Sequence, residues 1–366
     1  MKIREIQIGS HKFDFVFGQR VLDRIDRWIA PGGYTRYFII ADDGIPEEIV
    51  ERAVSAFAEL APTVALRFPG GEANKTLEVV SYLAEEIIRL GADRKSAIVA
   101  VGGGLTGNMA GVVAGLLYRG IALIHYPTTF LAATDSVLSI KQAVNLKAGK
   151  NLVGFFYPPR LVLVDTAVLT NSPTRHIRAG MCELVKNVLV TGNRDVVGEL
   201  NADNRYTPEQ IGNFIDYCIS TKISVLKNDM FEKADGLIFE YGHTIGHAIE
   251  LAENGRMLHG EAVAVGMLYA AKVSNRLELL SSSDRDLHFE LLDRIGILGD
   301  VRLSADTEEI YRYLLHDNKR GYLNLDEGKI GMVLLDGIGA PHRYEGQLLT
   351  PVDKSLVYQI LQEGTD

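Results

Sequence analysis

The sequence predicts an α/β domain followed by a mostly α-helical domain. Over the first half of the chain, short apolar runs alternate with helical patterns, which is typical of βαβ units and of a parallel sheet covered on both faces. From about residue 176 this alternation gives way to longer helical patterns. At 366 residues the chain exceeds the length at which single cores usually stop growing, so two domains are expected. We place them at residues 1–175 and 176–366.

The first domain is expected to begin with a hairpin over residues 1–17. Phe13, Phe15 and Phe17 alternate onto one face there, which is the period of a strand. Further apolar runs predict strands at 37–42, 64–68, 97–103 and 121–127, with helices at 45–60 and 76–90. Such a sheet binds ligands at the carboxyl ends of its parallel strands.

The second domain contains helical patterns at 175–190, 260–277 and 307–319. Near its end, residues 329–345 predict a hairpin turned by Gly337 and Gly339.

Composition restricts the classes of partner. A formal net charge of −9 is the opposite of the basic surface that nucleic acids and anionic membranes require, so neither partner is expected. The chain has two cysteines, Cys182 and Cys218, which fits a reducing compartment without disulfides. The N-terminus lacks the apolar run of a signal peptide, and no apolar stretch is long enough to span a bilayer. We therefore expect a cytoplasmic protein.

Three loops indicate a nucleotide site. Gly102, Gly104 and Gly107 follow a strand with the G-x-G-x-x-G spacing that lets backbone approach a pyrophosphate, although the usual acidic residue about 20 positions later is missing. Asp42 ends a predicted strand, where a carboxylate can accept ribose hydroxyls. The sequence PGGEANKT, residues 69–76, is a second glycine-rich loop. Together they predict dinucleotide binding, with NAD preferred over NADP because no arginine neighbours Asp42.

A cluster of histidines and carboxylates indicates a metal site. His243 and His247 are four residues apart and share one helix face, but Thr244 stands where a zinc protease carries glutamate, so a protease is not expected. His259 and Glu183 complete a set suited to Zn²⁺ or Co²⁺ with an open position for substrate. Spacing alone does not decide which two of the three histidines bind the ion.

Several lysines lie in polar motifs of this acidic chain. Each by itself is typical of a solvated surface charge, but together they offer the positive charge that would gather a phosphate. They are Lys141, Lys150, Lys186, Lys222 and Lys319.

Seven motifs, in chain order, resemble those of the dehydroquinate synthase superfamily of sugar-phosphate cyclases. They are PGGE-x-x-KT, VGGG-x-x-G, YPTTFLA, AVN-x-x-x-GKN, GMCELVK, YGHTIGHAIE and LHGEA, and they extend along nearly the whole chain. The resemblance implies an NAD-binding domain and a helical metal-binding domain. It also implies a homodimer that oxidises its substrate, eliminates phosphate, returns the hydride and closes a carbocycle by aldol addition.

Carried over by position, the resemblance implies roles for individual residues. The implied metal ligands are Glu183, His243 and His259, with His247 as the acid-base residue beside them. The implied NAD contacts are Asp42, Gly70, Gly71, Glu72, Lys75, Gly103, Gly104, Leu105, Thr106, Asn108, Thr128, Thr129, Ser139, Lys141 and Lys150. The implied catalytic and substrate-binding groups are Lys141, Lys150, Asn151, Lys186, Lys222, Glu240 and Lys319, with Glu232 assisting.

Two departures from the family pattern concern the substrate. Dehydroquinate synthases hold a substrate carboxylate with an arginine and an asparagine, where this chain has Gly236 and Glu240. Glu240 would repel a carboxylate, so the substrate should lack one. Ser139, Ile140 and Gln142 also replace the usual residues near the nicotinamide. These departures resemble the branch of the family that makes the carbocycle of aminoglycosides from D-glucose 6-phosphate, and they imply that Glu240 contacts sugar hydroxyls or moves a proton.

Other functions remain as alternatives. One is a related cyclase, either dehydroquinate synthase itself or an enzyme acting on a sedoheptulose phosphate. Another is a polyol dehydrogenase, which would accumulate NADH. A third is a catalytically silent NAD-binding subunit, which should have lost its ligand set, whereas Glu183, His243, His259 and Lys141 are all present. Cobalt and zinc are both compatible with that set.

Overall fold

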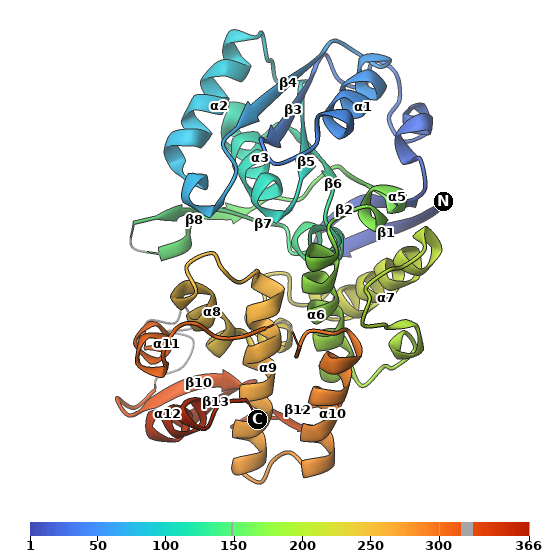
Figure 1. The fold of residues 1–366 in the computed structure, drawn as a ribbon. Coiled ribbons are helices and arrows are strands. Elements are labelled where there is room, and N and C mark those ends of the chain that lie inside the picture. The colour runs from blue at the N-terminus through green and yellow to red at the C-terminus, as the bar shows by residue number, and fades with distance from the viewer. Residues whose placement is uncertain (148, 300, 316–324, 366) are drawn as a thin grey trace. The chain divides into compact units, whose positions relative to one another are not determined.

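The computed structural model describes the chain except for residues 148, 300, 316–324 and 366. The described residues form two compact units (Figure 1). The first comprises Met1–Ser172 with Tyr206–Ile215, and the second comprises Pro173–Arg205 with Asp216–Asp366. The domain boundary after residue 175 stays a prediction.

A seven-stranded sheet forms the centre of the first unit, in the order β1-β2-β9-β6-β5-β3-β4. The N-terminal hairpin is confirmed, because β1 and β2 pair antiparallel. The pairs from β2 to β4 are parallel, which confirms the predicted α/β class. The strands are β1 (Lys2–Ile8), β2 (His11–Gly18), β3 (Tyr37–Asp42), β4 (Thr63–Phe68), β5 (Ala97–Gly102), β6 (Ala122–Pro127) and β9 (Leu161–Asp165).

Helices cover both faces of this sheet. Tyr37 and Ile39 of β3 belong to one apolar cluster, to which α1 contributes Phe57, whereas Phe38 and Ile40 belong to a second cluster with α2 and α3. Since successive side chains of a strand point to opposite faces, this division shows that β3 is buried on both sides. The helices are α1 (Glu47–Ala58), α2 (Leu77–Arg89), α3 (Gly104–Leu116), α4 (Phe130–Thr134) and α5 (Thr166–Thr170), with 3-10 turns η1 (Val21–Arg27), η2 (Glu72–Asn74), η3 (Leu117–Arg119) and η4 (Ser136–Leu138).

A separate antiparallel hairpin, β7 (Lys141–Leu146) with β8 (Gly149–Phe156), was not predicted. It lies against α3 at two glycines. A Cβ on Gly111 would lie 2.1 Å from Gln142 Oε1, and a Cβ on Gly115 would lie 2.2 Å from Phe155 Cε2. Larger residues at these two positions would push the hairpin away from α3.

The second unit is mostly helical, as predicted. Its helices are α6 (Thr174–Thr191), α7 (Pro208–Leu226, from residue 216 on), α8 (His243–Ala252), α9 (His259–Arg276), α10 (Ser282–Arg294), α11 (Thr307–Leu314) and α12 (Lys354–Glu363), with 3-10 turns η5 (Val197–Glu199) and η6 (Asp235–Glu240). The helices predicted at 175–190 and 260–277 are confirmed as α6 and α9. Of the helix predicted at 307–319, α11 covers residues 307–314, and positions 316–319 lie outside the described residues.

The predicted C-terminal hairpin is confirmed only around its turn. β11 (Leu335–Gly337) pairs with β12 (Ala340–Pro341), but β10 (Lys329–Val333) pairs with β13 (Leu349–Asp353) instead of folding back within 329–345. Pairing with β13 buries Ile330, Met332 and Val333, which a short hairpin would leave uncovered. In the described part of the chain, no helix combines the length and apolarity that crossing a bilayer requires.

Candidate active site

Glycine contacts bring three helices of the second unit close together. A Cβ on Gly260 would lie 1.8 Å from the carbonyl oxygen of Ala179, so α9 begins in backbone contact with α6. A Cβ on Gly266 would lie 2.1 Å from the carbonyl oxygen of Gly242, so α9 also contacts the start of α8. Protein interiors do not absorb such overlaps without moving whole helices. The three helices can therefore direct side chains to one point.

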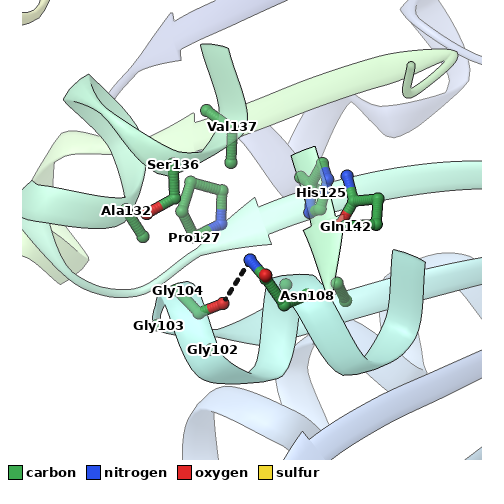
Figure 2. A pocket seen from close by; sticks show the side chains of 12 residues that line it. Gly102, Gly103, Gly104, Asn108, His125, Pro127, Ala132, Ser136, Val137 and Gln142 are labelled. Atoms are coloured by element: carbon green, nitrogen blue, oxygen red, sulfur yellow. Dashed lines mark hydrogen bonds between the residues drawn. The ribbon is translucent and has the colours of Figure 1, made fainter. Parts of the chain in front are cut away.

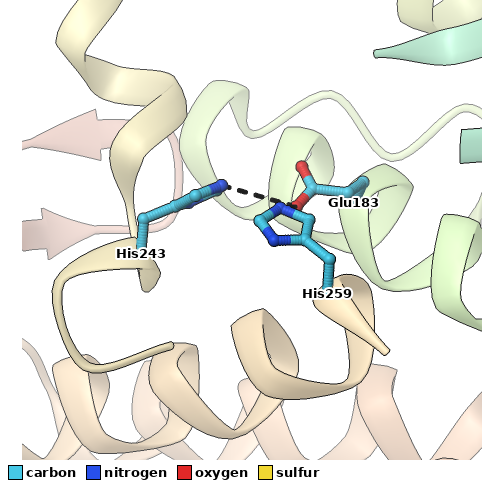
Figure 3. Close-up of side chains that lie close together, drawn as sticks. All are labelled: Glu183, His243 and His259. Carbon is cyan, nitrogen blue, oxygen red and sulfur yellow. Dashed lines mark ion pairs between the residues drawn. The ribbon is translucent and has the colours of Figure 1, made fainter. Parts of the chain in front are cut away.

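Glu183 from α6, His243 from α8 and His259 from α9 converge at that point (Figure 3). Each offers one ligand atom, and these atoms lie within 4.8 Å of one another. Glu183 Oε1 is 3.7 Å from Nε2 of both histidines. Both Glu183 oxygens are buried without a hydrogen bond, although Lys186 forms an ion pair with Oε2. A buried carboxylate with unused acceptor capacity is compensated by a cation, and this donor set suits Zn²⁺ or Co²⁺.

The second ring nitrogen of each ligand histidine is already held by an acceptor. His243 Nδ1 donates to the carbonyl oxygen of Tyr241 at 3.2 Å, and His259 Nδ1 donates to Glu250 Oε2 at 3.0 Å. These contacts place the lone pair on Nε2, the atom that faces Glu183. Burial lowers the pKa of His243 well below its ordinary value, and the charge of Lys186 adds to this, so the ring is neutral. A neutral imidazole is the form that binds metal.

His247 lies beside these ligands without belonging to the converging set. Its ring centroid is 5.2 Å from that of His243 and 5.8 Å from that of His259. The structure thus brings all three histidines together, and it gives His243 and His259 the orientation that a ligand needs.

The sequence prediction did not include Glu250. It follows His243 by seven residues on α8, which is two helical turns, so both side chains lie on one face of the helix. Helical spacing from His243 was the signal that could have identified it. Through its bond to His259, Glu250 sets the direction of a metal ligand that lies on a different helix.

Replacing Glu250 by alanine should weaken Co²⁺ binding by about 10–100-fold, the usual cost of losing an outer partner of a ligand histidine. Glu250→Gln should lower the Co²⁺ affinity by less, because the amide oxygen of glutamine can still accept from His259 Nδ1. Competition with a chromophoric chelator measures both affinities. Glu290→Ala is the matched control, since it removes a carboxylate from the exposed surface of α10. Equal Co²⁺ affinity in Glu250→Ala and the unaltered chain would show that this contact does not support the metal site.

Two of the predicted lysines are buried in the second unit. Lys186 is 1% exposed and Lys222 is 4% exposed, and Lys222 Nζ lies 5.1 Å from the ring centroid of Phe239. Lysines are seldom buried to this extent without a compensating anion. Lys186 has Glu183 for this purpose. Predicted Lys319 lies outside the described residues.

Carboxylates dominate the segment just before α8. Glu240 ends η6, and its charge acts on His243 so as to raise the pKa of that ring, against the effect of burial. Glu232 is buried, and a Cβ on Gly236 would lie 3.0 Å from Glu232 Cγ and 2.9 Å from Asp229 Oδ2. The space that an arginine at position 236 would need is therefore filled by acidic side chains.

In the first unit, the predicted cofactor residues lie at the carboxyl ends of parallel strands, which meet at one edge of a sheet. Asp42 ends β3, where its Oδ2 accepts from Thr106 Oγ1 at 2.5 Å and its Oδ1 accepts from the amide of Gly44 at 2.9 Å. A Cβ on Gly70 would lie 3.1 Å from Asp42 Oδ1, so the second glycine-rich loop passes directly beside this carboxylate. Gly71 follows with φ +92°, a conformation that favours glycine.

A small cavity lies at the N-terminus of α3 (Figure 2). Gly102, Gly103 and Gly104 line it together with Asn108. Asn108 Nδ2 donates to the carbonyl oxygen of Gly104 at 3.1 Å, while its Oδ1 accepts from the amide of Ala143 on β7 at 3.2 Å. Backbone N–H groups and the helix dipole at this end suit an anionic group such as a pyrophosphate.

The remaining cofactor residues surround the same edge. Thr129 caps α4 by accepting from the amide of Ala132, and the amide of Thr128 donates to the carbonyl oxygen of Gly102 at 3.0 Å. Ser139 Oγ accepts from the amide of Lys141 at 3.4 Å. Leu105 and Thr106 lie in the first turn of α3, and Lys150 and Asn151 lie on β8.

One arginine lies near this edge although it is distant in the sequence. Arg67 on β4 lies with its Nε 3.9 Å from Asp43 Oδ1, and its Nη2 donates to the carbonyl oxygen of Ile45 at 2.8 Å. Arg67 thus contacts the residue after Asp42, and the expectation that no arginine neighbours Asp42 stays a prediction. The carboxylate of Asp42 itself disfavours a 2′-phosphate.

The chain belongs to the 3-dehydroquinate synthase family. The family model described as 3-dehydroquinate synthase N-terminal matches residues 65–179, and the one described as 3-dehydroquinate synthase C-terminal matches residues 180–320. The resemblance found in the seven motifs is thus confirmed.

Among named relatives, the chain is similar to 2-deoxy-scyllo-inosose synthase of Niallia circulans, with 55% identity over 100% of both chains. It is 41% identical to the 2-deoxy-scyllo-inosose synthase of Streptomyces kanamyceticus, over 99% of this chain and 94% of that one. A crystal structure of 2-deoxy-scyllo-inosose synthase complexed with carbaglucose-6-phosphate, NAD⁺ and Co²⁺ matches with a TM-score of 0.97 and 55% identity, over 99% of this chain and 100% of that chain.

Proposed function

We propose that this chain converts D-glucose 6-phosphate to 2-deoxy-scyllo-inosose and phosphate, as a carbon–oxygen lyase that recycles bound NAD. One observation carries the proposal: the 55% identity, end to end, to the 2-deoxy-scyllo-inosose synthase of Niallia circulans. The related structure that holds NAD⁺, Co²⁺ and carbaglucose-6-phosphate supports the same cofactors and a hexose phosphate as substrate. The product would enter the assembly of 2-deoxystreptamine aminoglycosides.

The charges of the described residues favour such a substrate. Glu240 stands where other family members carry a carboxylate-binding asparagine, and Glu232 and Asp229 lie beside Gly236, where they carry an arginine, so we expect a carboxylated sugar to be repelled. Lys186 and Lys222 are buried cations, and we propose that they help to attract the phosphate of the substrate. A hexose with one phosphate and no carboxylate is compatible with the acidic side chains and with the buried lysines.

We assign the metal site to Glu183, His243 and His259. When bound there, a divalent cation supplies Lewis acidity to the sugar alcohol that NAD oxidises. His247, one turn after His243, would take and return a proton of the sugar. Glu240 orients sugar hydroxyls or moves a second proton, and Glu232 assists it.

We assign the NAD site to the edge described above. Asp42 would accept the ribose hydroxyls, and the N-terminus of α3 at Gly103 and Gly104 would hold the pyrophosphate. Asn108 on α3, which accepts from the amide of Ala143 in the hairpin, and Lys141 on β7 would bind the nicotinamide side. The substrate's phosphate and hydroxyls would be held by Lys141, Lys150, Asn151, Lys186, Lys222 and Lys319.

The proposed reaction conserves NAD. Hydride leaves C4 of the sugar, the C5 proton is then acidic and is lost as phosphate departs from C6, and the hydride returns to C4. The ring opens, and C6 attacks C1 to close the carbocycle. No oxidant is consumed, because the hydride that NAD accepts is the one that it returns.

Purified chain with NAD and Co²⁺ should release one phosphate per D-glucose 6-phosphate consumed, and mass spectrometry should identify a six-carbon cyclic ketone. NADH, followed by its absorbance, should not accumulate during turnover. This result would distinguish a cyclase from a polyol dehydrogenase. Steady accumulation of NADH, or no phosphate release at all, would contradict the proposal.

We also propose that the enzyme is a cytoplasmic homodimer that works with Co²⁺ or Zn²⁺. Both cysteines are buried free thiols, which agrees with a reducing compartment.

A further inference from the structure

The β7–β8 hairpin is irregular at Asn145. Val144 pairs with Val153, but the next pair is Leu146 with Gly149, so Asn145 faces a longer stretch of β8. The extra residues, 150–152, lie on β8, and the strand ladder is disrupted where they face Asn145. Bulges of this kind are over-represented beside active sites, and they are structural features that need a reason.

Asn145 binds a different loop with its backbone amide and its side chain. Its amide donates to the carbonyl oxygen of Lys75 at 2.8 Å. Its side-chain Nδ2 donates to Glu72, at 2.8 Å to Oε1 and at 3.2 Å to the carbonyl oxygen. Its Oδ1 accepts from the amide of Asn151 at 2.8 Å. Both donor positions of the side-chain amide and one acceptor position of its oxygen are therefore engaged.

One more bond closes a ring. Lys75 Nζ donates to Asn151 Oδ1 at 2.5 Å. Glu72, Lys75, Asn145 and Asn151 thus form a closed polar circuit between the loop of residues 69–76 and the hairpin. Asn145 is the member with direct bonds to all three of the others.

The circuit needs an amide at position 145. The Oδ1 must accept from a backbone N–H, while the Nδ2 must donate to a carboxylate and to a carbonyl. An aspartate would keep the first bond but would set a carboxylate against Glu72. The bonded amide of Asn151 also stabilises a backbone with φ +55°, which asparagine tolerates better than most residues.

We propose that Asn145 is a positioning residue that fixes the 69–76 loop against the hairpin before NAD binds. The inference rests on the proposed function, because Glu72 and Lys75 from the loop, and Lys141 and Lys150 from the hairpin, are cofactor contacts that the family resemblance implies. A site that is already ordered spends less of its interaction energy on ordering the protein when the ligand arrives. Loss of the circuit should therefore weaken NAD binding more than it slows the chemistry in the saturated enzyme.

The test is calorimetric titration of full-length Asn145→Ala with NAD, without sugar. The NAD dissociation constant should rise about tenfold, the change that about 1.4 kcal/mol produces. Turnover of D-glucose 6-phosphate at saturating NAD should change by no more than about threefold, since bound NAD re-forms the loop. Asn171→Ala is the matched control, because it removes a side chain that bonds one carbonyl oxygen, that of Ala167, and should leave NAD affinity unchanged.

A pair of substitutions tests the contact between Asn145 and Glu72. Asn145→Asp should bind NAD more weakly than Asn145→Ala, and Asn145→Asp should cost less NAD affinity in a Glu72→Gln background than in the unaltered chain, because a glutamine amide can donate to the new carboxylate. Amide hydrogen exchange should show faster exchange at residues 70–76 and at Asn151 in Asn145→Ala, with protection restored by NAD.

The outcomes are distinguishable. An unaltered chain that binds no NAD would overturn the proposed function. An unaltered chain that binds NAD, together with unchanged affinity and exchange in Asn145→Ala, would overturn this inference alone. If Asn145→Ala does not fold, the cost of Asn145→Asp in the Glu72→Gln background and in the unaltered chain decides, and equal costs would count against the circuit.

Discussion

His243→Ala is expected to strip the divalent cation from the enzyme, whereas His247→Ala is expected to leave it bound. The two residues lie one turn apart on α8, so the substitutions remove the same side chain from nearly the same environment. His243 Nε2 faces Glu183 and its Nδ1 is held by the carbonyl oxygen of Tyr241. Loss of a direct ligand should lower affinity by more than the roughly 100-fold that outer-shell losses can reach.

The metal content of both proteins after dialysis against a chelator measures this difference, and the visible absorption of bound Co²⁺ reports the geometry of the site. NAD affinity should stay unchanged in both variants, which controls for folding. His247→Ala should still lose most turnover, since it removes the proposed proton carrier. A chain that keeps its cobalt in His243→Ala but loses it in His247→Ala would reverse the assignment.

Glu240→Gln should lower turnover by about 10²–10⁴-fold, the range associated with loss of a general acid or base. NAD and cobalt should still bind, because Glu240 belongs to neither proposed site. Steady-state kinetics with D-glucose 6-phosphate, combined with cobalt content, separates these effects. Asp235→Asn is the control: it lies in the same short helix, η6, but is exposed and paired with Arg343. Turnover at the level of the unaltered chain would remove Glu240 from the reaction.

Much of the first unit follows from local pattern. The run YFIIAD predicts a strand at residues 37–42, and β3 spans those residues. It is buried on both faces, so its sequence carries no polar interruption. β9 was not predicted, although LVLVD is equally apolar, because no helical pattern comes between it and the preceding residues to suggest a crossover. The β7–β8 hairpin was missed for a different reason: its contacts with Gly111 and Gly115 are tertiary.

The candidate site likewise has some features that the sequence predicts and others that depend on tertiary contacts. Motif resemblance nominated Glu183, His243 and His259, but spacing left three histidines equivalent. The structure distinguishes His243 and His259, because Nε2 of each lies 3.7 Å from Glu183 Oε1. The role of Asn145 was likewise invisible, because it depends on a strand bulge and on a loop about 70 residues earlier in the chain. Such contacts arise from the fold and have no local sequence period.

Substrate selection by the acidic segment before α8 is the central claim, and a ratio of two rate constants tests it most directly. The value of kcat/KM should be measured by phosphate release for D-glucose 6-phosphate and for the carboxylated seven-carbon sugar phosphate that dehydroquinate synthases use. We expect turnover of the hexose phosphate and no measurable release from the carboxylated substrate. A higher kcat/KM for the carboxylated substrate would contradict this account of the pocket.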